Sequence, residues 1–293
     1  MNNFNFEKEK SPERFTSRIV LKFFRHAEQE PGNKEKSDFE RRLTATGREQ
    51  AIKKSKIQDI EQAVAFGSPR KRAQETAGFV MAGKQEEITG KESLEGLKEK
   101  LDKKIKVGSK IAVDERLDFP VGDWDSKYVQ EVFSAFKKSE GLKFIVEQSD
   151  KLAEKLNDNE NLTYSKAAAK ISGIILKYLN IAPKWDVLVQ DKEKKYSDTL
   201  ERFLASHLGV TESFLAKIID KTKDREERDE FIKALDNQGF DFTEGFDIKI
   251  LNRKPGIPEI WIDYKKEKDG DIIFEFSKNI NKELLEEVIN EGR

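Results

Sequence analysis

The two histidines of this 293-residue chain, His26 and His207, are the side chains best suited to chemistry near neutral pH. A neutral imidazole can attack an electrophile or carry a proton, and a reaction that needs two imidazoles must use both. Each histidine follows a short apolar run, at 18–24 and 200–205, and precedes polar or turn-forming residues. A lone histidine at a strand end is more often structural. The shared placement favours function, because ligands bind at the carboxyl ends of strands in parallel sheets.

Two arginines accompany the histidines and indicate an anionic ligand. Arg25 directly precedes the first histidine, and Arg72 lies at the start of a helix predicted over 72–81. Ser68 is the expected N-cap of that helix and Pro69 its expected first residue. A helix N-terminus attracts anions through its free N–H groups. If these groups converge they form a pocket for a dianion; otherwise Arg72 is an ordinary solvated helix charge.

The composition excludes several other kinds of site. The chain has 0 cysteines, which excludes disulfides, thiolate metal clusters and a cysteine nucleophile. A zinc site would need carboxylates besides the two histidines, and we expect no metal and no cofactor. With 55 basic and 56 acidic side chains, the formal charge of -1 gives no bulk attraction to nucleic acid or to an anionic membrane. No apolar run approaches the roughly 20 residues of a membrane helix, and the N-terminus lacks a secretory pattern. We therefore expect a cytoplasmic protein.

Strand and helix patterns alternate in the part of the chain that carries the histidines. The predicted strands cover 18–24, 62–66 and 200–205, and the predicted helices include 72–81 and 210–219. The stretch 44–49 opens a further helix, and Thr46 and Glu49 have the spacing of a capping box. The stretch 84–110 is poorly periodic, and helical patterns dominate 126–181. This alternation predicts an α/β layer fold.

The C-terminal part changes character. Alternating runs at 246–251, 259–264 and 272–276 predict half-buried strands, with a turn at 268–270 and a closing helix at 280–290. These strands either extend the sheet edge or form an oligomer contact. An edge covered by the last helix is favoured, and the oligomeric state stays open.

We therefore predict a three-layer α/β sandwich, with a mostly parallel central sheet flanked by helices, a helical insertion and a C-terminal β extension. Residues 1–14 are expected to be a flexible tail. The main domain would comprise 15–125 and 199–293. Residues 126–198 would form a helical cap over the carboxyl edge of the sheet.

Four separate segments resemble, in order, the motifs of the histidine phosphatase superfamily, the phosphoglycerate-mutase-like enzymes. They are FRHAE at 24–28, LTATGREQA at 43–51, SPRKRAQETA at 68–77 and LASHLGV at 204–210. One such match is weak evidence, whereas four in sequence are strong and include both histidines. Ala27 stands where the family has Gly. The segment 33–44 resembles the same region of phosphohistidine phosphatases and lacks the pattern expected of a mutase.

The resemblance implies a role for each site residue. His26 would be the nucleophile that accepts the phosphoryl group, while Arg25, Arg72 and His207 would hold its non-bridging oxygens. The family's acid often lies four residues before a Gly-x-Trp sequence, a position held here by Asp118, with Glu115 as the fallback.

The implied activity is metal-independent hydrolysis of phosphate monoesters through a phosphohistidine, on a small phosphorylated substrate. Two alternatives stay open. The first is a phosphohistidine protein phosphatase, whose partner would be a phosphoprotein. The second is a catalytically weak phosphate-binding or regulatory module, favoured by the lack of a clear glutamate acid. Neither nucleic acid nor a membrane is an expected partner.

Overall fold

A computed structural model describes residues 15–32, 37–55, 60–104, 110–191, 193, 196–253 and 256–293. The predicted tail, 1–14, lies outside the described residues. The strands are β1 Ser17–Arg25, β2 Val64–Gly67, β3 Ile111–Val113, β4 Thr199–Ser206, β5 Gly245–Asn252, β6 Glu259–Lys268 and β7 Asp271–Ile280. The helices are α1 Ala45–Lys54, α2 Lys71–Ala82, α3 Leu94–Asp102, η1 Glu115–Leu117, α4 Lys127–Lys137, α5 Gly141–Leu156, α6 Tyr164–Gln190, α7 Thr211–Thr222, α8 Arg225–Ala234 and α9 Lys282–Glu291.

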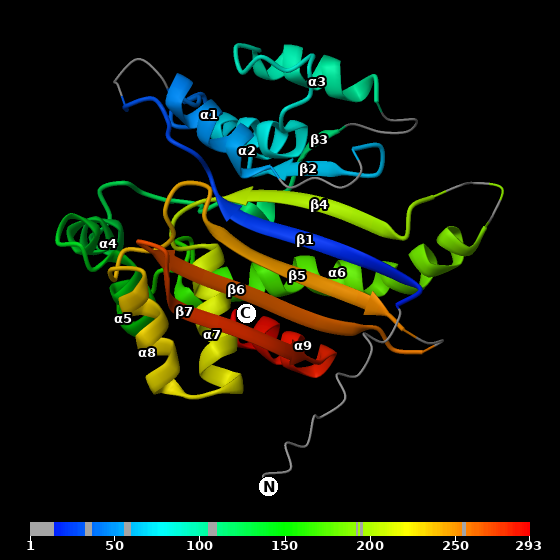
Figure 1. Cartoon of the computed structure of the whole chain (residues 1–293). Coiled ribbons are helices and arrows are strands. Elements are labelled where there is room, and N and C mark those ends of the chain that lie inside the picture. Colours follow the sequence, from blue (N-terminus) through cyan, green and yellow to red (C-terminus); the bar gives the residue numbers. More distant parts are fainter. Residues whose placement is uncertain are drawn as a thin grey trace, which may run out of the picture.

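Within the described residues, seven strands form one sheet in the order β3-β2-β4-β1-β5-β6-β7 (Figure 1). The first four are parallel to one another, and β5, β6 and β7 continue the sheet as antiparallel strands. Helices α1 and α2 cover one face near β2 and β4, while α6 and α7 cover the other. The predicted α/β sandwich, with helices on both faces and a C-terminal β extension, is confirmed.

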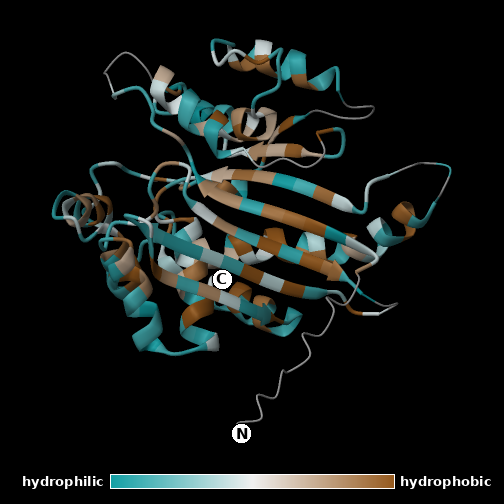
Figure 2. Cartoon of the chain, viewed as in Figure 1, coloured by the Kyte–Doolittle hydropathy of each residue, from teal (hydrophilic) through white to brown (hydrophobic). Residues whose placement is uncertain are grey.

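The apolar character of β1 follows from its central position. Ile19, Leu21 and Phe23 pack into the core on the α6 and α7 face, whereas Phe24 packs into the core on the α2 face. A strand with both faces covered needs apolar residues on both sides rather than a strict alternation. Figure 2 shows this as mostly hydrophobic colouring along the central strands.

Two helix starts differ from the sequence prediction. The N-cap of α1 is Thr44, whose hydroxyl accepts a hydrogen bond from the Gly47 N–H, and not Thr46. Helix α2 begins at Lys71 after Arg70, so the prediction of Ser68 as its N-cap was wrong. The Ser68 hydroxyl accepts from the Arg70 N–H at 3.2 Å, before the helix begins, and also bonds a distant side chain. Helix α3 was not predicted; it is capped by Ser93 and buries its leucines inside a segment of weak overall periodicity.

The predicted insertion, 126–198, contains elements of two kinds. Helices α4 and α5 lie beside the carboxyl ends of β1 and β4, at the left of Figure 1. Helix α6 packs against β1 and β5 and belongs to the helix layer of the sandwich. It also continues past the predicted end through Pro183. The division of the chain into a main domain and a cap stays a prediction.

The C-terminal strands extend the sheet through the predicted hairpin. Asp269 and Gly270 connect β6 to β7, both with positive φ, at 54° and 92°. Positive φ at both central residues matches the twist of a hairpin, which explains the Asp-Gly pair. Helix α9 packs against α6 behind this part of the sheet. Whether these strands also form an oligomer contact stays a prediction.

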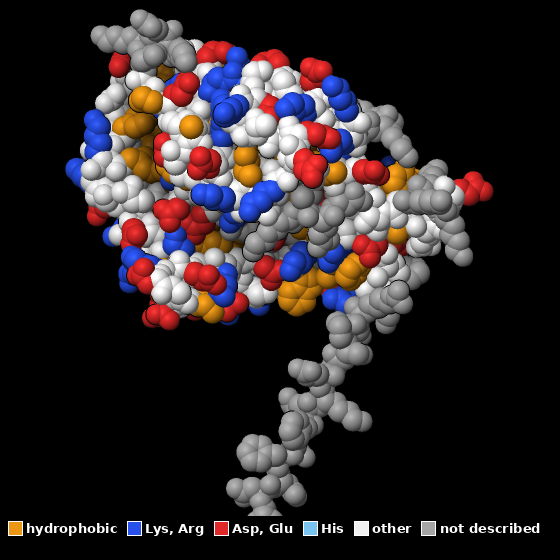
Figure 3. Space-filling model, turned by 45° about the horizontal axis from the view of Figure 1, so that its top comes forward, with side chains coloured by type: hydrophobic (Ala, Val, Ile, Leu, Met, Phe, Trp, Pro, Cys, Tyr) orange, Lys and Arg blue, Asp and Glu red, His pale blue; other side chains and the backbone are white. Residues whose placement is uncertain are grey.

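The described surface carries both signs of charge close together. Figure 3 shows basic and acidic side chains interspersed over the viewed face. Among the described residues, no helix is both long enough and apolar enough to cross a bilayer.

Candidate active site

A cavity of about 430 Å³ lies at the carboxyl ends of β1 and β4, and four of the five predicted site residues line it. Arg25 ends β1 and His26 follows it, while His207 follows β4 and Arg72 lies in the first turn of α2. Because β1 and β4 are parallel neighbours, with Arg25 opposite Ser206, their following residues emerge side by side. The ring centroids of the two histidines are 5.2 Å apart.

His26 is held with one ring nitrogen occupied. Its Nδ1 lies 2.8 Å from the Ala27 carbonyl oxygen, so that Nδ1–H donates to this carbonyl and Nε2 carries the lone pair. Burial, with the positive charges of Arg72, Arg25 and Arg41, lowers the pKa of His26 to about 3. The neutral, nucleophilic form of the imidazole therefore dominates at neutral pH.

His207 is held in place by Ser68 and Phe119. Its Nε2 is hydrogen-bonded to the Ser68 hydroxyl at 2.6 Å, and the Phe119 ring packs edge-on at 4.7 Å between centroids. Burial, with His26 and the nearby arginines, lowers the pKa of His207 well below its usual value. Its Nδ1 is buried without a hydrogen-bond partner among the described residues.

Arg72 is buried and Arg25 is half-buried, and each guanidinium has a donor that no described residue uses. Arg25 donates from one terminal nitrogen to the Phe240 carbonyl at 2.6 Å, and Arg72 donates to the backbone and carboxylate of Asp38 at 2.8 and 3.0 Å. The Nε atoms of Arg25 and Arg72 are buried with no partner among the described residues. Unpartnered buried donors are uncommon in folded proteins, and these two belong to residues that line one cavity. The arrangement suits an anion with several oxygens.

The structure does not place the fifth predicted residue, Asp118, on the cavity wall. Its carboxylate accepts a hydrogen bond from Arg70 Nε at 2.7 Å and lies 3.5 Å from His207 Nε2. The fallback acid, Glu115, is exposed and does not line the cavity.

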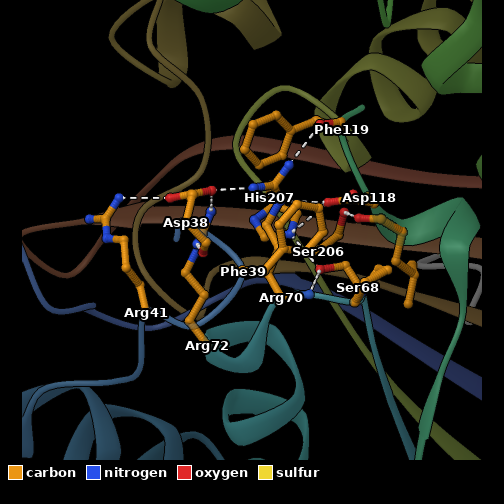
Figure 4. Close-up of polar contacts among 12 residues, drawn as sticks. Asp38, Phe39, Arg41, Ser68, Arg70, Arg72, Asp118, Phe119, Ser206 and His207 are labelled. Atoms are coloured by element: carbon orange, nitrogen blue, oxygen red, sulfur yellow. Dashed lines mark hydrogen bonds and ion pairs between the residues drawn. The ribbon is translucent and has the colours of Figure 1, made fainter. Parts of the chain in front are cut away.

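Sequence reasoning missed Asp38 and Arg70, which form the polar network drawn in Figure 4. Among the described residues, Asp38 is the only carboxylate that lines the cavity. It pairs with Arg72, Arg70 and Arg41. Burial tends to raise the pKa of Asp38, but bonds and charges from these arginines outweigh burial and lower it. Arg70 also contacts Asp118, with its guanidinium 4.0 Å from the Phe119 ring centroid. The sequence signals were the position of Arg70 inside the third motif and that of Asp38 inside the segment 33–44, which resembles phosphohistidine phosphatases.

Other motif residues build the site without lining it. The Thr76 hydroxyl accepts from the Ala27 N–H at 3.0 Å and donates to the Arg72 carbonyl at 2.7 Å, which fixes the end of β1 against α2. Gly47 is required because a Cβ there would collide with the Glu28 carbonyl oxygen. These contacts explain in physical terms why the motifs extend beyond the histidines and arginines.

Glu212 connects the two loops that carry His207 and support Arg25. This fully buried carboxyl accepts from the backbone N–H groups of Gly209 and Phe240 at 3.0 and 2.9 Å. Phe240 in turn accepts the hydrogen bond from Arg25. Burial raises the pKa of Glu212, despite these bonds. Glu212 is thus a positioning residue for both sides of the cavity.

Among the described residues, no group of three histidine, cysteine or carboxylate side chains is placed to hold a metal ion. The donor set consists of guanidinium and imidazole nitrogens around a cavity, which suits an anion rather than a cation. The arrangement can hold a phosphoryl-like group against a free imidazole nitrogen.

Residues 21–100 match the model of the histidine phosphatase superfamily, branch 1, a span that contains the first three motifs. No curated protein has a detectably similar sequence. Solved structures with a related chain path include a mycobacterial glucosyl-3-phosphoglycerate phosphatase, at 16% identity and a TM-score of 0.44, covering 80% of this chain and 90% of that one. Another is mycobacterial hydrolase 1, at 15% identity and 0.47, covering 86% and 99%.

A phosphoserine phosphatase from Entamoeba histolytica is 12% identical with a TM-score of 0.39, covering 83% of this chain and 94% of that one. With TM-scores below 0.5, none of the three structures superposes closely on this chain. The predicted resemblance to the histidine phosphatase superfamily is confirmed, through its branch 1 and over residues 21–100.

Proposed function

We propose that this protein is a metal-independent phosphatase that hydrolyses phosphate monoesters through a phosphohistidine on His26. One observation carries the proposal: His26 binds the Ala27 carbonyl through Nδ1, which leaves Nε2 free in a cavity that Arg25, Arg72 and His207 also line. A neutral nucleophile avoids repulsion by the phosphate dianion, and fixed cationic donors stabilise the charge of the transition state.

The proposed reaction has two steps. Nε2 of His26 attacks phosphorus, the P–O bond to the alcohol breaks, and the leaving oxygen takes a proton from a carboxylic acid. Water then attacks the phosphohistidine and gives a proton to the carboxylate formed in the first step, which releases inorganic phosphate and restores both neutral His26 and the acid. Arg25, Arg72 and His207 hold the non-bridging oxygens in both steps. No step draws on a metal ion.

Asp118 is the proposed proton donor, since its carboxylate lies 3.5 Å from His207 Nε2 at the edge of the site. Asp38 is its rival, since it lines the cavity. Both now accept hydrogen bonds from Arg70, so substrate binding must release one of them for proton transfer. The binding-module alternative draws on the same observation, because neither carboxyl is free in this state.

The first test compares the wild type with His26→Asn on an aryl phosphate. We expect kcat/KM to fall by at least about 10⁴-fold, with no loss on adding EDTA to the wild type. Acid-quenched wild type should carry a phosphate on His26, detected by mass spectrometry of the peptide. Full activity of His26→Asn, or loss with chelator, would exclude the mechanism; no turnover of any ester would favour the binding module.

The proton donor can be identified by comparing esters whose leaving groups differ in their need for a proton. The true acid, when replaced by its amide in Asp118→Asn or Asp38→Asn, should slow an alkyl phosphate far more than an aryl phosphate, whose leaving group hardly needs a proton. Equal losses on both esters remove that residue from the role. Hydrolysis of a phosphohistidine protein in the same assay would favour the protein-phosphatase alternative.

A further inference from the structure

The cavity has a second end that the phosphoryl chemistry does not use. Beyond Phe119 its wall is built mainly from apolar side chains of α4 and of the segment that leads into it, including Val121, Trp124, Val132, Phe133 and Phe136. We call these five residues with Phe119 the apolar wall. The charged residues that line the cavity, Arg25, Asp38, Arg41 and Arg72, belong to the phosphoryl end together with the histidines.

The few polar side chains near the apolar wall already have partners. The Tyr128 hydroxyl donates to the Leu162 carbonyl at 2.8 Å. The Asn161 amide donates to Asp158 at 2.6 Å and accepts from the Gly122 N–H at 3.2 Å. The Thr163 hydroxyl caps α6. A ligand hydroxyl or carboxylate placed here would exchange water for a mostly apolar wall, which disfavours binding.

Two members of the wall are exposed to a degree that packing alone does not explain. Trp124 is 47% exposed and Phe133 is 40% exposed, and their rings stack with centroids 5.6 Å apart. Helix α4 packs against α5 through its other side chains. Both rings line the cavity, so the pair adds exposed aromatic surface to it, which suits an apolar ligand.

We infer that the substrates are phosphate monoesters of apolar alcohols, either aryl or straight-chain alkyl, rather than sugar phosphates or phosphorylated hydroxy acids. The phosphoryl group would bind at His26, and the apolar group would lie against the wall. A cavity of about 430 Å³ is within the range that binds ligands of moderate size. The inference rests on the proposed function for the position of the phosphoryl group.

The test uses matched esters with the wild-type protein. Methyl, propyl and hexyl phosphates differ only in apolar length, and glycerol 1-phosphate has the propyl skeleton with two added hydroxyls. We expect kcat/KM to rise about three- to fourfold per methylene until the wall is covered. Propyl phosphate should be preferred to glycerol 1-phosphate by at least about tenfold.

Binding without turnover is measured by calorimetry with the corresponding alkylphosphonates, which cannot be hydrolysed. Their Kd should fall with chain length in the same way. Phe133→Ser should reduce the ratio of hexyl to methyl affinity at least about fivefold, since it removes much of the aromatic face. Ile272→Ser on β7 is the matched control, because Ile272 is 53% exposed and lies outside the cavity, and the ratio should not change.

The outcomes separate the two proposals. Turnover of every ester with no dependence on chain length, together with equal phosphonate affinities, overturns the apolar substrate class and leaves the phosphatase intact. No turnover with chain-dependent phosphonate binding overturns the phosphatase and supports the apolar site. A preference for glycerol 1-phosphate over propyl phosphate contradicts the inference directly.

Discussion

The two ends of the cavity are built in different ways. At the phosphoryl end, side chains from β1, α2 and β4 meet through hydrogen bonds between segments far apart in the sequence, and each of the two histidines and Arg72 is almost wholly buried. At the other end one amphipathic helix, α4, and the segment before it supply exposed aromatic side chains. The first end is fixed for one chemical group, whereas the second can change its side chains without disturbing the sheet.

This difference predicts how substitutions behave. A change in a cationic group that holds the phosphoryl oxygens alters an interaction that every ester makes, so it should affect all esters by the same factor. The proton donor is the exception, because an aryl leaving group hardly needs the proton. A change at the apolar wall alters only contacts to the leaving group, so its effect should depend on the ester. Substitutions at the phosphoryl end should therefore have the larger effects on catalysis.

Arg72→Ala should lower kcat/KM by about 10²- to 10³-fold, because it removes a buried guanidinium from the charge that develops on phosphorus. The factor should be the same for methyl, hexyl and aryl phosphates in steady-state assays. Lys71→Ala is the matched control: Lys71 is adjacent, pairs with Glu40 and does not line the cavity. A loss of activity confined to one class of ester would contradict the prediction that the phosphoryl end acts on all esters alike.

Asp38→Asn should tighten inhibition by inorganic phosphate by about tenfold, because the Asp38 carboxylate now occupies donors of Arg72 and Arg70 that an incoming anion needs. The inhibition constant reports binding alone and so does not depend on which carboxyl donates the proton. Glu40→Gln removes a nearby charge that pairs with Lys71 instead, and it should leave phosphate inhibition within about twofold. Unchanged or weaker inhibition in Asp38→Asn would show that Asp38 supports the arginines rather than competing with the ligand.

The sequence predicted the phosphoryl end better than it predicted the rest. The strand patterns and motifs predicted that Arg25, His26, Arg72 and His207 would meet near the strand ends, and the four line one cavity there, because parallel neighbouring strands bring their ends together. The Asp38–Arg70–Asp118 network was not predictable, since three segments meet there only in the folded chain. The N-cap at Ser68 failed for the same reason: its hydroxyl bonds His207, 139 positions away.

For the apolar wall, the sequence predicts the helix but not what the apolar side of that helix contacts. The periodicity of Val129, Val132, Phe133 and Phe136 predicted a helix correctly, as α4. Periodicity does not say which partner an apolar helix face will contact. Here part of that face borders a cavity instead of a core, which only the position of α4 beside the ends of β1 and β4 reveals.

The two ends of the cavity should also differ in how they make the stability of the protein depend on pH. The pKa of His26 is lowered to about 3, and that of His207 lies well below its usual value, so the folded protein keeps both rings neutral. The unfolded chain protonates each near pH 6.5 and binds more protons below that pH, so the free energy of unfolding should fall as the pH falls. Each histidine contributes a slope of up to about 1.4 kcal/mol per pH unit between about pH 6.5 and pH 5.

Urea unfolding of the phosphate-free protein at several pH values measures this slope. His26→Asn should make it shallower by up to about 1.4 kcal/mol per pH unit, because one neutral buried imidazole is gone. Phe133→Ser should leave it unchanged, since the apolar wall has no titratable group. Comparing each variant with the wild type cancels the carboxyl groups that all three proteins share. Equal slopes in the wild type and His26→Asn would mean that His26 takes up its proton in the folded state near its ordinary pKa, so that the fold would not keep the nucleophile neutral below about pH 6.5.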